Sequence, residues 1–560
     1  MRISERLFVF LLLCAVVTLP VHAQTDPYHK GLDALSVDVV KAQLEFLASD
    51  WTDGRETGQK GSFLAADYLA SQFKILGIQP AGDYQAAARR RQLMFMGPSG
   101  GGRPERVRTY FQNLPLIQYE LGNEQHFSLV TRTGNGEETT TFGYRTDYSV
   151  TVSTTGITVS APVVFVGYGL TDEKNNYDDF KGVDVKGKFI LRLSGFPGYK
   201  DTASAAYKKF RPPDQGPFPR RGGPNRNERL QQLGVAGVID VIAGQDPSLG
   251  WATNYPFRFN AENYEGDVPL NPSQPRMALA GDTLRDNITV VQVTSRVANE
   301  LVKGSGIDLS SFDEQVMKTV KPASKSINGK AAFLKTTVKS SIVQARNVVG
   351  MIEGENPKEI LVVGAHYDHL GNRGGYIYNG ADDNASGTIA VMSIARACAA
   401  AGVKPKRTIV FAAWVGEEQG LVGSQFFVQR PPVPVKDIQL NVNYDMIGRN
   451  SPQDSAGTQC GMTFTEGFPL LKEVTERQNR ENNLGLKLNI RSSQRPGGGS
   501  DHASFAAMNI PVMSWMAAMH AEYHQPGDQV EKINYDKMTK IIKLGFLNVW
   551  ELANAEKGLR

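Results

Sequence analysis

Residues 359–369 read EILVVGAHYDH, an apolar run that ends directly before a histidine and an aspartate. An apolar run of this length is typical of a buried β-strand. His366 and Asp368 therefore lie where the strand ends. In an open α/β sheet the carboxyl ends of the strands gather along one edge, and ligands bind there. The stretch predicts such a sheet, with a polar site at its edge.

The pattern of a strand followed by polar residues recurs along the chain. Strand-like runs occupy residues 408–415, 440–444, 488–491 and 510–515. From about residue 335 onward these runs alternate with helical patterns, which predicts a mostly parallel sheet covered by helices. The side chains that follow the runs are Glu417, Glu418, Asp445, Asp501, His502, His520 and His524. A random scatter of histidines and carboxylates would not favour the ends of strands, so these residues are candidates for one site.

A pair of aspartates, Asp382 and Asp383, precedes a further helical pattern in the run GADDNASG at residues 380–387. By itself such a pair is explained by N-capping of the helix and by the negative charge that a helix start favours. Beside His366 and two adjacent glutamates, the pair instead completes the parts of a hydrolytic metal site. Two divalent cations need a bridging carboxylate, flanking histidine or carboxylate ligands and a separate base.

Five motifs follow one another along the chain, namely GAHYDH at 364–369, GADDNASG at 380–387, GEEQG at 416–420, NYDM at 443–446 and YH at 523–524. They stand in the same order in the M28 zinc peptidases of the aminopeptidase Y and S type, and the chain resembles this family. Residues 30–84 resemble the N-terminal segment of the family, and the middle of the chain resembles a protease-associated domain. The resemblance implies an α/β fold, with a mixed, mostly parallel sheet sandwiched by helices and an inserted β-rich domain.

We therefore expect four segments along the chain. They are a signal peptide at 1–23, the N-terminal part of the peptidase domain at 24–115, a protease-associated domain at 116–295 and the catalytic domain at 296–560. The first segment has the features of a secretory signal, because Arg2 and Arg6 precede an apolar stretch at 7–17 that is too short to span a bilayer. The mature protein is then exported, periplasmic or extracellular, with no membrane segment after cleavage.

The resemblance also implies a cofactor of two zinc ions per chain, although cobalt or manganese suit similar nitrogen and oxygen ligands. The implied ligands are His366 and Asp445 for one zinc ion, Glu418 and His524 for the other, and Asp382 as the bridge between them. The peptide bond between Asp382 and Asp383 is expected to be cis. His369 and His520 are interpreted as ordinary structural histidines, and His502 is placed near the pocket but not among the ligands.

The implied reaction is hydrolysis of a peptide bond by a metal-bridging hydroxide. Glu417 is implied to be the general base, which takes a proton from water and later delivers one to the leaving amine. Asp368 is implied to accept a hydrogen bond from the His366 ring and so to fix its tautomer. Carboxylate neighbours raise the pKa of Glu417 and zinc ions lower it, so the sequence does not decide the net direction.

The implied activity is that of an aminopeptidase acting on peptides with a free N-terminus. The same fold and ligands also support carboxypeptidases and, with altered ligation, glutaminyl cyclases. Relatives that have lost ligands act as receptors, but every expected ligand position is filled here. A net charge of +4 without a basic stripe argues against nucleic-acid binding. Cys398 and Cys460 remain after cleavage, which excludes a disulfide scaffold but leaves one bridge open. The oligomeric state also stays open.

Overall fold

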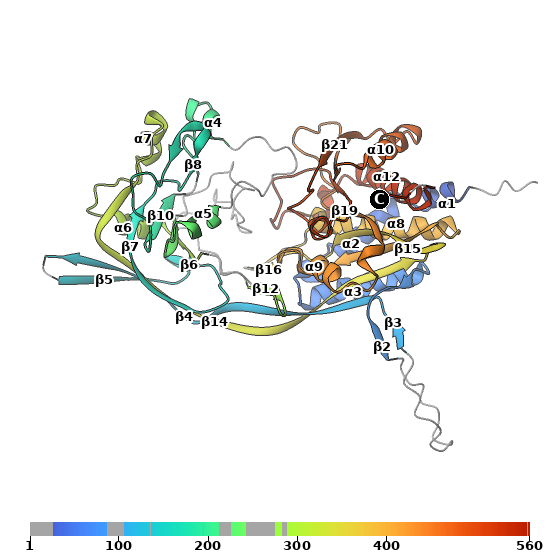
Figure 1. The fold of residues 1–560 in the computed structure, drawn as a ribbon, viewed down its shortest axis with the longest axis horizontal. Helices are drawn as coiled ribbons and strands as arrows, with labels where there is room; N and C mark the ends of the chain where they lie inside the picture. The colour runs from blue at the N-terminus through green and yellow to red at the C-terminus, as the bar shows by residue number, and fades with distance from the viewer. Residues whose placement is uncertain are drawn as a thin grey trace, which may run out of the picture.

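A long two-stranded ribbon joins two lobes in the computed structural model (Figure 1). The ribbon consists of β4 (Phe111–Thr133) and β14 (Lys325–Ile352), which pair antiparallel along most of their length. The structure describes residues 26–86, 106–134, 136–193, 195–211, 226–241, 275–282, 288–373, 375–556 and 558–559. The expected signal peptide lies outside these residues. Among them, no helix is both long and apolar enough to cross a membrane.

The larger lobe contains a sheet with the strand order β21-β20-β22-β19-β15-β18-β14. The bounds are β15 (Asn356–His366), β18 (Arg407–Trp414), β19 (Ile438–Tyr444), β20 (Gln459–Thr465), β21 (Lys487–Ser493) and β22 (Val512–Met516). The central strands β18, β15, β19 and β22 run parallel. At one side of them β14 pairs antiparallel with β18, and at the other side β20 pairs antiparallel with β22. This mixed, mostly parallel sheet confirms the predicted fold class.

The central strands are buried on both faces. In β18 the odd-numbered residues from Ile409 to Ala413 belong to one hydrophobic core, and the even-numbered residues from Val410 to Trp414 belong to the other. Because side chains alternate along a strand, a strand between two cores needs an apolar residue at every position. Burial on both faces therefore explains the continuous apolar runs in the sequence.

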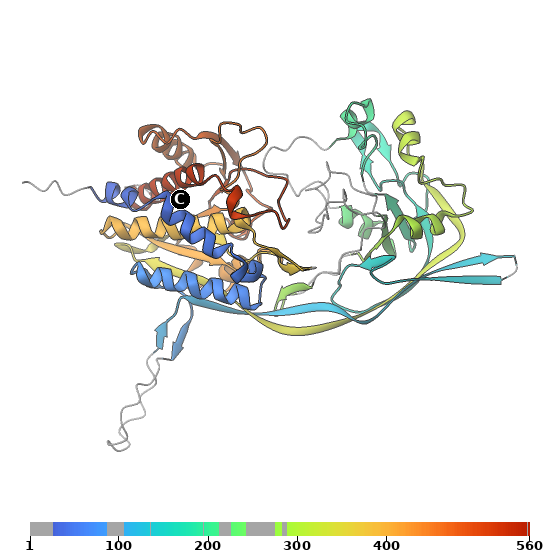
Figure 2. The same ribbon diagram turned by 180° about the vertical axis from the view of Figure 1, so that it is seen from behind.

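Helices cover both faces of the larger sheet, and Figure 2 shows the N-terminal helices in blue on one of them. The helices on that face are α1 (Pro27–Asp33), α2 (Val37–Leu47), α3 (Lys60–Ile75), α8 (Gly387–Ala401) and α12 (Tyr535–Asn554). The opposite face carries α9 (Val422–Gln429) and α11 (His502–Ala507). Their aromatic residues Phe427 and Phe505 pack against Trp414 of β18. The sheet is thus sandwiched by helices, as predicted.

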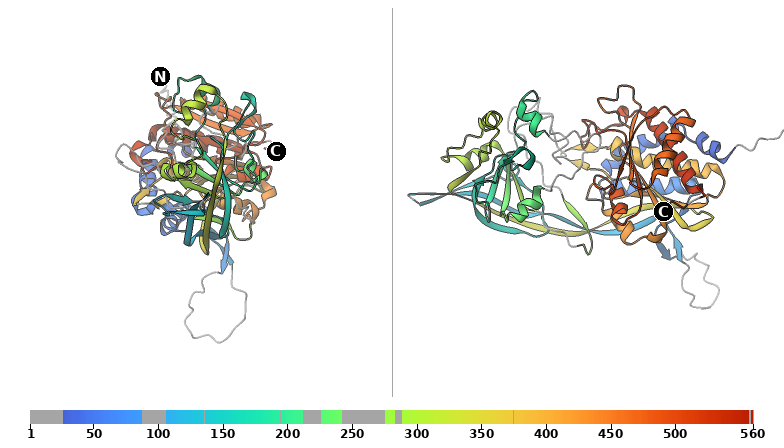
Figure 3. Two further views of the ribbon diagram at one scale, coloured as in Figure 1. Left: turned by 90° about the vertical axis from the view of Figure 1, so that its left-hand side faces the viewer. Right: turned by 45° about the horizontal axis from the view of Figure 1, so that its top comes forward.

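The smaller lobe continues the sheet on the far part of β14 (Figure 3). Its strands are β6 (Tyr148–Val150), β7 (Ile157–Phe165), β10 (Phe189–Leu193), β11 (Gly237–Val241) and β13 (Val290–Val293), and its helices include α6 (Ser295–Val302) and α7 (Phe312–Thr319). It has a hydrophobic core of its own, which reaches from Phe127 to Leu334. The lobe is rich in β-strands, and its core continues past residue 295, where the sequence placed the end of the inserted domain.

The two described cysteines lie in different elements and do not pair. Cys398 lies in α8 and Cys460 in β20, and both are buried and free. Burial raises the pKa of both thiols. They therefore stay protonated near neutral pH and behave as small apolar side chains.

Candidate metal centre

The predicted site residues meet at the carboxyl edge of the larger sheet. His366 ends β15, Asp445 directly follows β19, and the glutamates Glu417 and Glu418 follow β18. These three strands are neighbours in the sheet, so their ends bring the side chains together. His524 reaches the same edge from the loop after β22, where its backbone has a positive φ of 54°.

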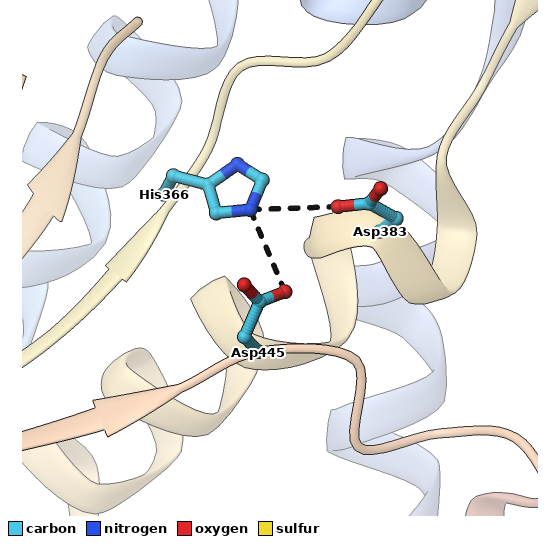
Figure 4. A group of neighbouring side chains, drawn as sticks. All are labelled: His366, Asp383 and Asp445. Carbon is cyan, nitrogen blue, oxygen red and sulfur yellow. Dashed lines mark ion pairs between the residues drawn. The ribbon is translucent and has the colours of Figure 1, made fainter. Parts of the chain in front are cut away.

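His366, Asp383 and Asp445 form the first of two clusters (Figure 4). The Nε2 atom of His366 lies 3.4 Å from Asp383 Oδ1 and 3.5 Å from Asp445 Oδ1. All three side chains are buried. The Oδ1 atom of Asp445 has no hydrogen-bond partner among the described residues. Such a group of converging, partly unpaired ligand atoms is what a bound cation requires.

The second cluster surrounds the other oxygen of Asp383. The Nε2 atom of His524 lies 3.0 Å from Asp383 Oδ2 and 3.3 Å from Glu418 Oε2. The Nδ1 atom of His369 lies 2.9 Å from Glu418 Oε1 and 4.0 Å from Asp383 Oδ2. Asp383 therefore directs one oxygen to each cluster, with a histidine and a second carboxylate on either side.

The expectation for Asp382 needs correction, because its side chain faces away from both clusters. Its Oδ2 atom lies 3.3 Å from His520 Nε2, and its Oδ1 atom accepts a hydrogen bond from the Gly448 N–H at 2.6 Å. Asp383, the next residue, has extended dihedral angles (φ −102°, ψ 96°) inside the turn at Ala381–Ser386. The two aspartates therefore point to opposite sides, and Asp383 replaces Asp382 as the candidate bridge. The cis peptide bond is also one residue further along, at Asp383–Asn384.

Asp368 contacts the site in a different way from the one expected. The Nδ1 atom of His366 lies 3.2 Å from the backbone oxygen of Asp368, whereas the nearer carboxylate oxygen is 3.7 Å away. The carboxylate instead accepts hydrogen bonds from the Thr57 hydroxyl at 2.9 Å and the Glu417 N–H at 3.2 Å. The carbonyl of Asp368 thus orients the imidazole, and its carboxylate holds the segment that carries the two glutamates.

Glu417 is buried next to the first cluster, and this burial shifts its pKa. Burial raises the pKa of Glu417 well above its ordinary value; His366 opposes this, and Glu418, Asp501 and Asp445 add to it. The sequence left the direction of this shift open, and the protein residues alone push it upward. A bound divalent cation would act in the opposite direction.

Of His369, His502 and His520, the three other histidines weighed for the site, His369 is the one that the sequence interpretation missed. Its ring contacts Glu418, although it was assigned an ordinary structural role. The available signal was its position three residues after His366, just beyond the end of the same strand. His520 lies behind the site against Asp382. His502 belongs to neither cluster and shares a hydrogen bond with Ser514 at 3.2 Å.

The charges of the two clusters fit bound cations. Burial alone would lower the pKa of His524, but Glu418 and Asp383 outweigh it and raise the pKa to about 10. The same carboxylates thus attract positive charge strongly in a buried site, where unpaired carboxylates are costly. Nitrogen from histidine and oxygen from carboxylates are the donors that zinc accepts. The residues present therefore suit two divalent cations, one for each oxygen of Asp383.

The helix-covered sheet and its histidine–carboxylate edge resemble those of α/β metallohydrolases. Residues 347–547 match the sequence model of Peptidase family M28. The chain therefore contains an M28 peptidase domain, as the motifs predicted. The likeness of the middle of the chain to a protease-associated domain stays a prediction.

Solved structures share the whole architecture. An aminopeptidase from Aneurinibacillus sp. strain AM-1 superposes with a TM-score of 0.55 at 17% identity, covering 95% of this chain and 97% of the other. A zinc aminopeptidase from Bacillus subtilis has a TM-score of 0.52 at 18% identity, covering 94% of this chain and 97% of the other. At this level of identity the likeness shows a common fold.

Curated relatives are similar over shorter stretches. A glutamate carboxypeptidase 2 homolog from Caenorhabditis briggsae is 28% identical over 413 residues, which are 64% of this chain and 48% of that protein. Leupeptin-inactivating enzyme 1 from Streptomyces exfoliatus is 30% identical over 197 residues, which are 35% of this chain and 41% of that protein. The chain spans about half the length of the curated relatives it matches.

Proposed function

We propose that this chain is an exported di-zinc exopeptidase, and in the first place an aminopeptidase that removes residues from the free N-terminus of peptides. The observation that carries the proposal is the position of Asp383. Its two carboxylate oxygens face His366 on one side and His524 on the other. A two-cation hydrolase needs such a carboxylate between two sets of ligands.

His366, Asp383 and Asp445 would hold one zinc ion, and Asp383, Glu418 and His524 the other. When bound, zinc ions polarise the carbonyl of the scissile bond and lower the pKa of water. His369 contacts the Glu418 oxygen that faces away from His524, so it would orient this carboxylate.

Glu417 is the group that moves protons in this proposal. A general base works best when its pKa lies near the operating pH. Burial and three nearby carboxylates raise the pKa of Glu417, and bound cations would bring it down again, toward that range. Glu417 then takes the proton from the attacking water and delivers it to the leaving amine. The Asp368 carboxylate, which accepts the Glu417 N–H, holds this residue in place.

The choice of an aminopeptidase has support from proteins of similar sequence and fold. Leucine aminopeptidase 2 of Trichophyton equinum is 26% identical over 237 residues, and the two solved structures described above are aminopeptidases. The Caenorhabditis relative is named as a carboxypeptidase homolog, so carboxypeptidase activity is the alternative. A cyclase acting on N-terminal glutamine is a second alternative on the same fold.

A panel of matched peptides tests the proposal. The full chain is incubated with each peptide carrying a free N-terminus, an acetylated N-terminus or an amidated C-terminus, with and without a zinc chelator. Release of the first residue from the free and the amidated peptides, blocked by acetylation and by the chelator, supports an aminopeptidase. Release of the last residue, or cyclisation without hydrolysis, would establish one of the alternatives. Turnover that is indifferent to the chelator would overturn the role of the metal.

A further inference from the structure

Two buried side chains of opposite charge hold the loop that presents Asp383. This loop, residues 379–383, starts directly after β17 (Tyr376–Tyr378) and runs into the turn at Ala381–Ser386. Arg55 donates to backbone carbonyls at the start of this loop, and Asp528 accepts from backbone N–H groups at its end. The two residues are far apart in the sequence and approach the loop from different parts of the fold.

All three guanidinium nitrogens of Arg55 donate hydrogen bonds to backbone oxygens. Its Nη1 donates to the carbonyls of Asn379 at 2.6 Å and Leu47 at 2.8 Å, and its Nη2 donates to that of Gly380 at 3.0 Å. Its Nε donates to the carbonyl of Tyr367 at 2.7 Å, directly after His366. Arg55 therefore ties the strand end that carries His366 to the loop that carries Asp383.

Asp528 completes the hold from the other side. Its carboxylate accepts the N–H of Asp382 at 3.0 Å and the N–H of Asp383 at 3.0 Å. Its backbone carbonyl accepts the N–H of Ala381 at 3.2 Å. Three successive N–H groups of the loop are thus bound to one residue. Asp528 also lies only four positions after His524, so it links the loop to the segment that carries this histidine.

Burying a charged side chain costs free energy of folding, yet the fold buries both Arg55 and Asp528. Arg55 and Asp528 are both 0% exposed. Arg55 also has a positive φ of 52°, which is unfavourable for a residue other than glycine. Burial lowers the pKa of Arg55 to about 10, with Asp368 and Asp383 opposing the shift, so the guanidinium stays charged at neutral pH. A planar fork that serves four carbonyls at once is a task that lysine cannot perform.

We propose that Arg55 and Asp528 are positioning residues, which form a clamp that fixes the backbone of residues 379–383 so that the two oxygens of Asp383 face the two ligand clusters before any cation binds. The clamp rests on the proposed function, because it prepares the site for zinc. Neither residue contacts the reacting atoms. The clamp acts through the loop, and the charge of Arg55 also reduces the repulsion among the carboxylates that the loop brings together.

The first test compares zinc affinity among variants of the full chain. The variants are Arg55→Met, Arg55→Lys and Asp528→Asn, with Arg407→Lys as the matched control. Arg407 is also a buried arginine that donates to two backbone carbonyls, those of Leu552 and Ala555, but it lies at the opposite end of β18. Zinc affinity is measured by competition with a chromophoric chelator, and the melting temperature of each metal-free variant is recorded.

We expect Arg55→Met and Asp528→Asn to weaken zinc binding by about 10–100-fold, the usual effect of losing a group that orients ligands. Arg55→Lys should recover part of the loss, and Arg407→Lys should bind zinc as the wild type does. Wild-type zinc affinity in Arg55→Met and Asp528→Asn would overturn the clamp, however far their melting temperatures fall. If Arg55→Met does not fold, Asp528→Asn decides the matter, because it keeps the shape of the side chain.

The second test needs no metal. Amide hydrogen exchange over residues 379–385 is followed in the metal-free wild type, Asp528→Asn and Arg407→Lys. Faster exchange in Asp528→Asn alone supports the clamp, and equal exchange in all three overturns it. Should the wild type take up no zinc at all, the proposed function fails, but this comparison still decides whether the clamp holds the loop.

Discussion

Asp383 Oδ1 lies 3.4 Å from the Nε2 atom of His366, on the side of the loop opposite to its neighbour Asp382. The Asp383 Oδ2 atom contacts His524. Two adjacent aspartates therefore have different tasks, although the sequence presents them as equivalents. This division leads to a direct comparison of the two residues.

We expect Asp383→Asn to weaken the binding of both zinc ions by more than the 10–100-fold that is usual for groups behind the ligands. The amide removes the negative charge from a position that both clusters share. Asp382→Asn should have a much smaller effect, because its Oδ1 atom can still accept the Gly448 N–H. Zinc content after dialysis, measured by atomic emission, distinguishes the two variants. Equal zinc loss in both would show that the bridging position is wrongly assigned.

The fold was predictable because its strands are buried on both faces. A strand such as β18 needs apolar residues at the positions that lie between the two cores, here 409–414, and that requirement leaves an unbroken run in the sequence. His366 and Asp445 were predictable for the same reason, since each directly follows such a run. The periodicity of the sequence does not tell which strand ends belong to one site, and that prediction came from the motifs.

The parts that were missed depend on geometry without a local signature. Whether Asp382 or Asp383 faces the ligands is decided by the backbone angles inside one turn. The position of His369 beside Glu418 depends on how two strand ends lie in space. The extent of the smaller lobe depends on the ribbon, in which a single strand, β14, belongs to both lobes.

Replacement of Glu417 by glutamine should separate metal binding from turnover. Glutamine keeps the size of the side chain but cannot take up a proton, so we expect activity to fall by about 10²–10⁴-fold. Zinc content should remain that of the wild type, because Glu417 belongs to neither ligand cluster. Steady-state kinetics and metal analysis on the same sample test both statements. Turnover within tenfold of the wild type would exclude Glu417 as the base.

The ribbon between the lobes contains a close contact that can be tested by stability. The pairing of β4 and β14 shifts register between Thr336 and Val338, and a Cβ atom at Gly122 would lie 2.3 Å from the Thr337 hydroxyl. Gly122→Ala should therefore destabilise the protein by about 1–3 kcal/mol through overpacking. The double variant with Thr337→Ala should recover only part of this loss, because the hydroxyl is gone but the Thr337 Cβ atom, 2.9 Å from the added Cβ, remains.

Urea unfolding of Gly122→Ala, Thr337→Ala and the double variant gives the coupling energy of the two positions. Gly134→Ala is the control, since a Cβ atom there has no heavy atom within 4 Å. Strictly additive effects of the two single substitutions would mean that the contact between Gly122 and Thr337 is not the source of the destabilisation.

His502 should make the stability of the larger lobe depend on pH. Burial lowers the pKa of His502 to about 4 in the folded protein, from an ordinary value of 6.5. Between about pH 4 and 6.5 the unfolded chain therefore binds more protons than the folded one, so the free energy of unfolding falls as the pH falls through this window. The loss attributable to His502 is roughly 3 kcal/mol. His502→Gln does not titrate and should lose correspondingly less stability between pH 7.5 and 4.5. Urea unfolding at both pH values measures the difference, with the exposed His29→Gln as control. An equal loss in wild type and His502→Gln would show that His502 does not remain uncharged in the folded state.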